Sequence, residues 1–130
     1  VLASLNSART KARDAKRLSD VNQIQNALNL YYDEFNRYPL TLAELEAKSY
    51  LPVVPKDPFL VPYLYAVNSA RTDFHLGTRL EEASLETGPL VSDKDCRSDT
   101  TVGRSCFDEV ATTGFDGTDS LINRIFDIVP

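Results

Sequence analysis

Residues 2–35 contain neither proline nor glycine, and this uninterrupted stretch constrains the fold more than any other feature of the sequence. It predicts one long helix over residues 1–36, which ends ahead of Pro39 because the residue before a proline disfavours helical backbone angles. In its second half, large apolar side chains recur at steps of three and four, which gathers them on one helix face. They are Leu18, Val21, Ile24, Leu28, Tyr31, Tyr32 and Phe35. We expect this half to pack on a hydrophobic core.

The first half of the predicted helix has a different composition. Between residues 6 and 17 the only apolar side chains are the small ones of Ala8, Ala12 and Ala15. Residues 1–17 carry a net charge of +4, whereas the rest of the chain sums to −9. Because small side chains bury little area, we expect this half to project from its own domain and to lack partners there.

Nucleic-acid binding is not expected as the main role of this chain. The net charge of −5 describes an acidic body, whereas a dedicated nucleic-acid binder needs a broad basic face. The basic helix could enter DNA as the basic region of a leucine-zipper protein does. That arrangement requires sustained heptads for dimerisation, and residues 18–35 are too short to supply them.

The segment that follows the helix predicts irregular structure. Thr41 and Glu44 have the spacing of a capping box, which favours a short helix from 42 to about 48. Four prolines between residues 51 and 62 exclude regular structure there. Residues 37–62 are therefore predicted to form a loop that connects the long helix to a sheet.

Residues 63–80 predict a β-hairpin. A β-prone run over 63–67 and an alternating run over 73–80 are separated by turn-forming residues at 68–71. In the second run, alternation predicts a half-buried strand. Its expected core-facing side chains are Phe74, Leu76 and Leu80, and its expected solvent-facing ones are Asp73, His75 and Arg79.

Residues 81–130 predict a polar loop region that ends in a short strand over 125–129. Cys96 and Cys106 are the only cysteines of the chain, and a disulfide between them is the simplest interpretation. Two unpaired thiols are the alternative. A disulfide would indicate an oxidising compartment. A zinc site is not expected, because no histidine or further cysteine lies nearby in the sequence.

The length and the order of elements favour a single α+β domain over residues 1–130. A long N-terminal helix would pack on a small antiparallel β-sheet built from the hairpin and the terminal strand. The first half of the helix would project beyond this body.

Several segments of the first 80 residues carry a family resemblance through their order and spacing. They are the basic helix of 2–17, the run 20–28, Tyr31-Tyr32, Asn36-Arg37-Tyr38-Pro39, Leu51-Pro52, the run 55–59 and Tyr63-Leu64-Tyr65. Together they resemble the type IV pilins and the major pseudopilin of type II secretion. The resemblance implies a pilin-like fold and a structural filament subunit, and no enzymatic activity.

The resemblance also implies partners and a location. Such subunits are held in the bacterial inner membrane by an apolar N-terminal helix before an assembly platform builds them into a filament in the periplasm or at the cell surface. The start of this chain, residues 1–5, resembles the end of an apolar segment that has been cut away, and no run reaches the ~18 residues of a membrane span.

Sister subunits would supply the partners that the first half of the helix is expected to lack. The side chains predicted at this subunit interface are Leu2, Leu5, Arg9, Arg13, Lys16 and Arg17. A solvated helix face or a juxtamembrane charge is the alternative interpretation of the basic ones. The alternative function is that of a minor pilin at the filament tip, an adhesin or DNA-uptake receptor, with residues 81–120 carrying specificity. The sequence leaves open whether the filament is a pilus or a secretion pseudopilus.

Two further features could carry chemistry. His75 is the only histidine, and without a placed nucleophile or pocket we predict a surface histidine and no catalytic residue. Asp116 and Asp119 lie in a loop-like run over 114–120, and major pseudopilins bind calcium in their C-terminal loop. No cofactor is predicted, and calcium held by these two carboxylates is the alternative to a solvated turn.

Overall fold

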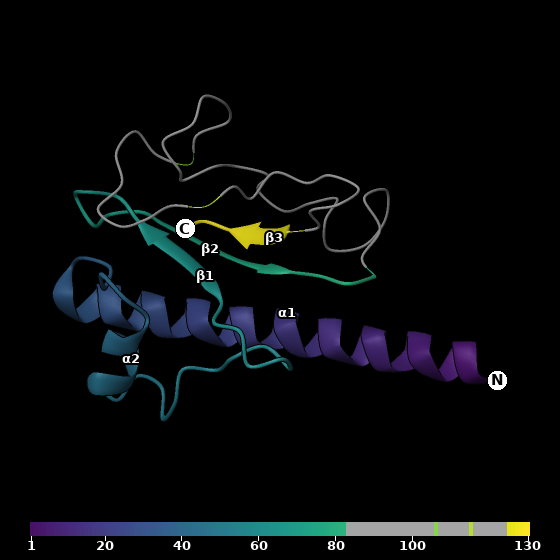
Figure 1. Cartoon of the computed structure of the whole chain (residues 1–130). Coiled ribbons are helices and arrows are strands. Elements are labelled where there is room, and N and C mark those ends of the chain that lie inside the picture. The colour runs from purple at the N-terminus through teal and green to yellow at the C-terminus, as the bar shows by residue number, and fades with distance from the viewer. Residues whose placement is uncertain (83–105, 107–114, 116–124) are drawn as a thin grey trace.

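The long helix and the small antiparallel sheet are both present in a computed structural model of the chain, which confirms the α+β, pilin-like fold class (Figure 1). The structure describes residues 1–82, 106, 115 and 125–130. Its elements in chain order are α1 (Leu2–Phe35), α2 (Ala43–Ala47), β1 (Leu64–Val67), β2 (Phe74–Arg79) and β3 (Ile125–Ile128). Among these described residues, no helix combines the length and the apolar character that crossing a membrane requires.

The apolar stripe of α1 lies against one face of the sheet, as its periodicity predicts. Val21, Ile24 and Leu28 are completely buried, and Tyr31 is nearly so. The helix ends at Asn36, whose left-handed backbone (φ 51°) lets its N–H donate to the carbonyl of Tyr32 at 2.7 Å. Asparagine tolerates this conformation, so the stop is encoded locally, three residues before Pro39.

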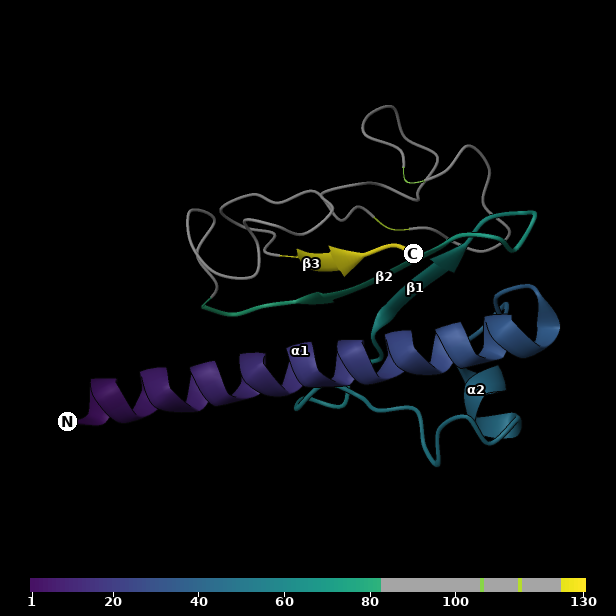
Figure 2. The ribbon, with the colours of Figure 1, turned by 180° about the vertical axis from the view of Figure 1, so that it is seen from behind.

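The segment after α1 folds back along the side of α1 that faces away from the sheet, as both Figure 1 and Figure 2 show. Its helix, α2, begins at Ala43, and the Glu44 carboxylate accepts the N–H groups of Leu40 at 2.7 Å and Thr41 at 3.3 Å. Glu44 therefore makes its hydrogen bond of the predicted capping box. No side chain at the N-cap position of α2 accepts a backbone N–H in return. The other Glu44 oxygen accepts the Tyr31 hydroxyl at 2.9 Å, which ties this segment to α1.

The sheet is antiparallel, with the strand order β1-β2-β3. Tyr65 lies opposite Leu76 in the β1–β2 pair, and Leu76 lies opposite Ile128 in the β2–β3 pair. The predicted turn is held by Asn68, whose side-chain oxygen accepts the N–H groups of Thr72 at 2.8 Å and Asp73 at 3.1 Å. The terminal strand thus completes the sheet on the far side of the hairpin.

The prediction that β2 is half-buried is wrong, because both of its faces are covered. Every residue from Phe74 to Thr78 is buried, and the predicted surface histidine, His75, has no exposed area. The second face is covered by Phe115, whose ring stacks on that of His75 with centroids 3.8 Å apart. Gly77 leaves room for this ring, since a Cβ at that position would lie 2.9 Å from it.

Candidate functional site

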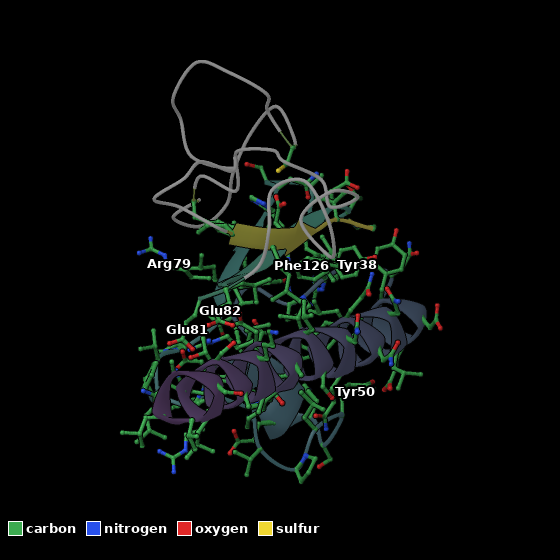
Figure 3. The ribbon with its side chains drawn as sticks, turned by 90° about the vertical axis from the view of Figure 1, so that its right-hand side faces the viewer. Tyr38, Tyr50, Arg79, Glu81, Glu82 and Phe126 are labelled. Atoms are coloured by element: carbon green, nitrogen blue, oxygen red, sulfur yellow. The ribbon has the colours of Figure 1, made fainter. Side chains whose placement is uncertain are left out.

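The basic part of α1 meets acidic side chains of its own domain in a charged hub, defined here as Arg13, Asp14, Arg17, Asp57 and Glu81. These residues come from three segments: α1, the proline-rich loop and the chain just after β2. Figure 3 places Glu81 and Glu82 between the sheet and the N-terminal half of α1. The hub therefore joins the helix to both neighbouring segments.

Arg17 lies at the centre of the hub, and its side chain is only 3% exposed. One terminal nitrogen donates to Asp14 Oδ1 and to Glu81 Oε2, each at 2.8 Å. The other terminal nitrogen donates to Asp57 Oδ2 at 3.1 Å. A planar guanidinium with several donors suits such a site, where a lysine could not reach all three carboxylates with the same geometry.

Asp14 joins α1 to the backbone that follows β2. Its carboxylate accepts the N–H of Glu81 at 2.9 Å and the N–H of Glu82 at 2.9 Å. Arg13 reinforces this contact with two hydrogen bonds to the Glu81 carboxylate, at 2.7 and 3.1 Å. Burial of these polar groups is tolerable because each has a partner of opposite charge or a backbone donor.

The ionisation of the hub follows from these contacts. Hydrogen bonding by Arg13 lowers the pKa of Glu81 below its usual 4.5, against the opposing effect of burial. Burial alone would raise the pKa of Asp57, but hydrogen bonds from the Val61 N–H and from Arg17 outweigh it and lower that pKa. Burial likewise opposes the charge of Arg17, yet its carboxylate partners raise its pKa. All three groups are therefore charged at neutral pH.

The expectation that the whole first half of α1 projects without partners is wrong for residues 13–17. Arg13 and Arg17 were predicted at a subunit interface, yet both are bound to carboxylates of their own domain, and Arg17 is buried. Lys16 pairs with Asp20 one turn along, although its side chain stays half exposed. The signal that could have indicated the hub is Asp14, the single acid of residues 1–17, three positions before Arg17.

The first turns of α1 do project, and they carry the remaining predicted interface residues. Leu2 is 77% exposed and Leu5 is 47% exposed, and Arg9 is exposed as well. Within residues 1–82, 106, 115 and 125–130, one hydrogen bond connects this part to the body, from the Ser7 hydroxyl to Glu82 at 3.2 Å. Within the described part of the chain, Arg9 makes no ion pair. These turns therefore present exposed apolar and basic side chains to another molecule.

A second cluster of polar groups lies on the far face of the sheet. His75 Nε2 and Asp127 Oδ2 are 2.5 Å apart and completely buried, as diagonal neighbours on β2 and β3. Their ligand atoms and the Cys106 sulfur lie within 4.8 Å of one another. Cys106 is bonded in a disulfide, so its sulfur is not the thiolate that binds metals. We therefore interpret the cluster as packing that stabilises the far face of the sheet.

Three predicted residues lie outside the described part of the chain. They are Cys96, the predicted partner of Cys106, and Asp116 and Asp119, the predicted calcium ligands. Cys106 is disulfide-bonded, and the sequence holds one other cysteine, Cys96. The calcium site stays a prediction.

Comparison with known proteins agrees with this arrangement. The family model described as type II secretion system (T2SS), protein G matches residues 4–79, more than half of the chain. The match runs through α1, α2 and the hairpin. No curated protein and no solved structure matches the chain. The chain therefore belongs to the protein G family of the type II secretion system, the major pseudopilins, which is a family of structural proteins.

Proposed function

We propose that this protein is the subunit that polymerises into the pseudopilus of a type II secretion system, with α1 as its polymerisation element and no catalytic role. The observation that carries the proposal is the family match over residues 4–79. The exposed apolar side chains of Leu2 and Leu5 on the first turns of α1 support it. Exposed leucines at adjacent turns of a helix favour association, because association removes their area from water.

The charged hub gives each part of α1 a different task in this proposal. Arg17 fixes the direction of the helix relative to its own head, because two of its carboxylate partners, Asp57 and Glu81, lie on separate segments outside α1. The projecting turns, with Leu2, Leu5 and Arg9, then contact neighbouring subunits. A helix held at a fixed angle presents these turns identically in every copy, which a regular filament requires.

The resemblance to pilins leads us to propose further that the native subunit is held in the inner membrane by an apolar helix preceding α1. An assembly platform would then transfer the subunit to a filament in the periplasm or at the cell surface. The residues encoded immediately ahead of Val1 test this. An apolar run of about 20 residues would support it, and a polar sequence there would contradict it.

Assembly of the encoded full-length protein tests the main proposal. Filaments are sheared from cells and the subunit is quantified in the filament fraction and in whole cells. We expect Leu5→Asp to remove the subunit from filaments while its cellular level stays unchanged. Leu40→Asp, at another exposed leucine on the loop before α2, is the matched control and should assemble normally. Normal assembly of both variants would contradict a role for these turns.

A minor subunit at the filament tip, acting as adhesin or DNA-uptake receptor, is the second candidate. The match to protein G, the major pseudopilin, favours the first. Copy number separates the two, because a major subunit accounts for most of the mass of purified filaments. A few copies per filament would favour the tip role.

A further inference from the structure

An exposed apolar finger lies at the edge of the proline-rich loop, and the proposed polymerisation does not use its apolar side chains. We define the finger as residues 57–62. Phe59 is 60% exposed, Leu60 is 77% exposed and Val61 is 56% exposed. Single exposed apolar residues are common on protein surfaces, but three in succession on a tight turn mark an interaction site.

The finger is held rigidly, and its anchor is part of the hub. Asp57 Oδ1 accepts the N–H of Phe59 at 2.9 Å and the N–H of Val61 at 2.8 Å. The Asp57 carbonyl accepts the Leu60 N–H at 2.8 Å, while Asp57 Oδ2 binds Arg17. Leu60 adopts a left-handed backbone conformation with φ 63°. This conformation is unfavourable for a leucine, and it holds the side chain in solvent, where it can contact another molecule.

Basic side chains surround the finger, although the chain as a whole is acidic. The guanidinium groups of Arg13 and Arg17 lie 5.2 and 5.5 Å from the centre of the Phe59 ring. Lys56, immediately before the finger, is exposed. Among the described residues its side chain forms no ion pair, and the same holds for Arg9 and Lys11. The hub carboxylates neutralise Arg13 and Arg17. The positive charge beside the tip therefore comes from Lys56 and from Arg9, which lies one turn before Arg13 on the same helix face.

We propose that the finger inserts into the headgroup region of a bilayer that contains anionic phospholipids. Apolar side chains on the tip and basic side chains around it are the combination that binds such a surface, the first by burial and the second by attraction to lipid phosphates. The contacts of Phe59 with Arg13 and Arg17 place the finger beside the N-terminal half of α1, on the side of the helix away from the sheet (Figures 1 and 2).

A second copy of the chain suits the finger less well. Three side chains on a convex turn can bury far less surface area than the roughly 800 Å² per partner that a stable protein interface buries. The exposed apolar patch at Leu2 and Leu5 is followed by Arg9 and Lys11, so pairing it with the finger would bring like charges together. A lipid surface removes both difficulties, because it adapts to a convex tip and carries negative charge.

Vesicle sedimentation with this 130-residue chain tests the proposal. Vesicles of phosphatidylcholine with about 30% phosphatidylglycerol are compared with vesicles of phosphatidylcholine alone. We expect binding to the first only, and about tenfold weaker binding for Leu60→Asn. Asparagine accepts a positive φ more readily than leucine, so this change removes the apolar group without adding backbone strain. Leu40→Asn is the matched control and should bind as the unaltered chain does.

The charge contribution is tested separately with Lys56→Glu, which we expect to weaken binding to the anionic vesicles about tenfold. Raising the salt concentration from about 0.05 to about 0.5 M should also weaken the binding of the unaltered chain, because salt screens its attraction to the lipid phosphates. Absence of binding to anionic vesicles would overturn the proposal. Equal binding by the Leu60→Asn and Leu40→Asn variants, with unchanged circular dichroism, would overturn it as well.

Light scattering of the chain without lipid separates the finger from the proposed polymerisation. Monomers that bind anionic vesicles through Leu60 support the lipid assignment. Dimers that Leu60→Asn dissociates would assign the finger to a second copy and overturn it. Vesicle binding and filament assembly by the encoded full-length protein are independent measurements, so the loss of one does not decide the other.

Discussion

The two halves of α1 are held to the same body by different forces. Between Val21 and Tyr31 the helix is held by apolar side chains that lie entirely inside the core. Between Arg13 and Asp20 it is held by ion pairs and hydrogen bonds to the loop and to the chain after β2. Among the residues that the structure describes, the turns before Arg13 contact the body through the hydrogen bond from Ser7 to Glu82.

The comparison teaches that a helix without an apolar stripe can still be fixed to its own domain. The apolar half depends on area removed from water, which tolerates small displacements. The charged half depends on directional contacts of Arg17 with Asp57 and Glu81, which lie outside the helix and define its angle. A filament subunit needs both: a stable head and a defined helix direction.

The largest effect should come from the apolar half. Leu28→Ala removes a completely buried side chain, and we expect the free energy of unfolding to fall by about 3 kcal/mol through lost burial and a new cavity. Urea denaturation measures it. Leu30→Ala, at a 55% exposed position two residues on, is the control and should change stability by less than about 0.5 kcal/mol. Similar losses in both variants would show that this half is not packed as described.

A smaller loss is expected when the hub loses its central cation. Arg17→Met keeps much of the side-chain volume but leaves Asp14 and Asp57 without their guanidinium partner. We expect the free energy of unfolding to fall by about 2 kcal/mol, because these two carboxylates would then be partly buried without a cationic partner. Arg9→Met alters an exposed arginine of the same helix and should be nearly neutral. An unchanged midpoint of urea denaturation for Arg17→Met would mean that the hub does not stabilise the attachment of α1.

The third effect is a pH dependence that only the charged half should show. The folded pKa values of Glu81 and Asp57 lie below their usual 4.5 and 3.8. Their stabilisation is therefore complete above about pH 4.5 and is lost as the pH falls through the lowered folded values. We expect a decline of about 1 kcal/mol there, measured by thermal unfolding between pH 6 and pH 3. Arg17→Met should reduce the slope, and an identical slope in this variant would contradict the assignment to the hub.

The sequence predicts the part of the fold that depends on local patterns. Spacing of apolar residues gives the core half of α1, prolines give the loop, and alternation gives the hairpin. The hub was missed because Asp57 and Glu81 are 40 and 64 positions away from Arg17, and charge composition alone does not pair them. His75 was misplaced because alternation assumes that one face of β2 meets solvent, whereas Phe115 and Asp127 cover it. The resemblance to pilins supplied the function that no catalytic or ligand motif could have indicated.

Photo-crosslinking in assembled filaments tests most directly the claim that the free turns of α1, and not its charged half, meet neighbouring subunits. A benzoylphenylalanine is placed at Leu5 or, as the control, at Glu46 on the exposed side of α2 in the encoded full-length protein. We predict subunit dimers from position 5 and few or none from position 46. Filaments that assemble normally but yield no dimers from position 5 would contradict the account.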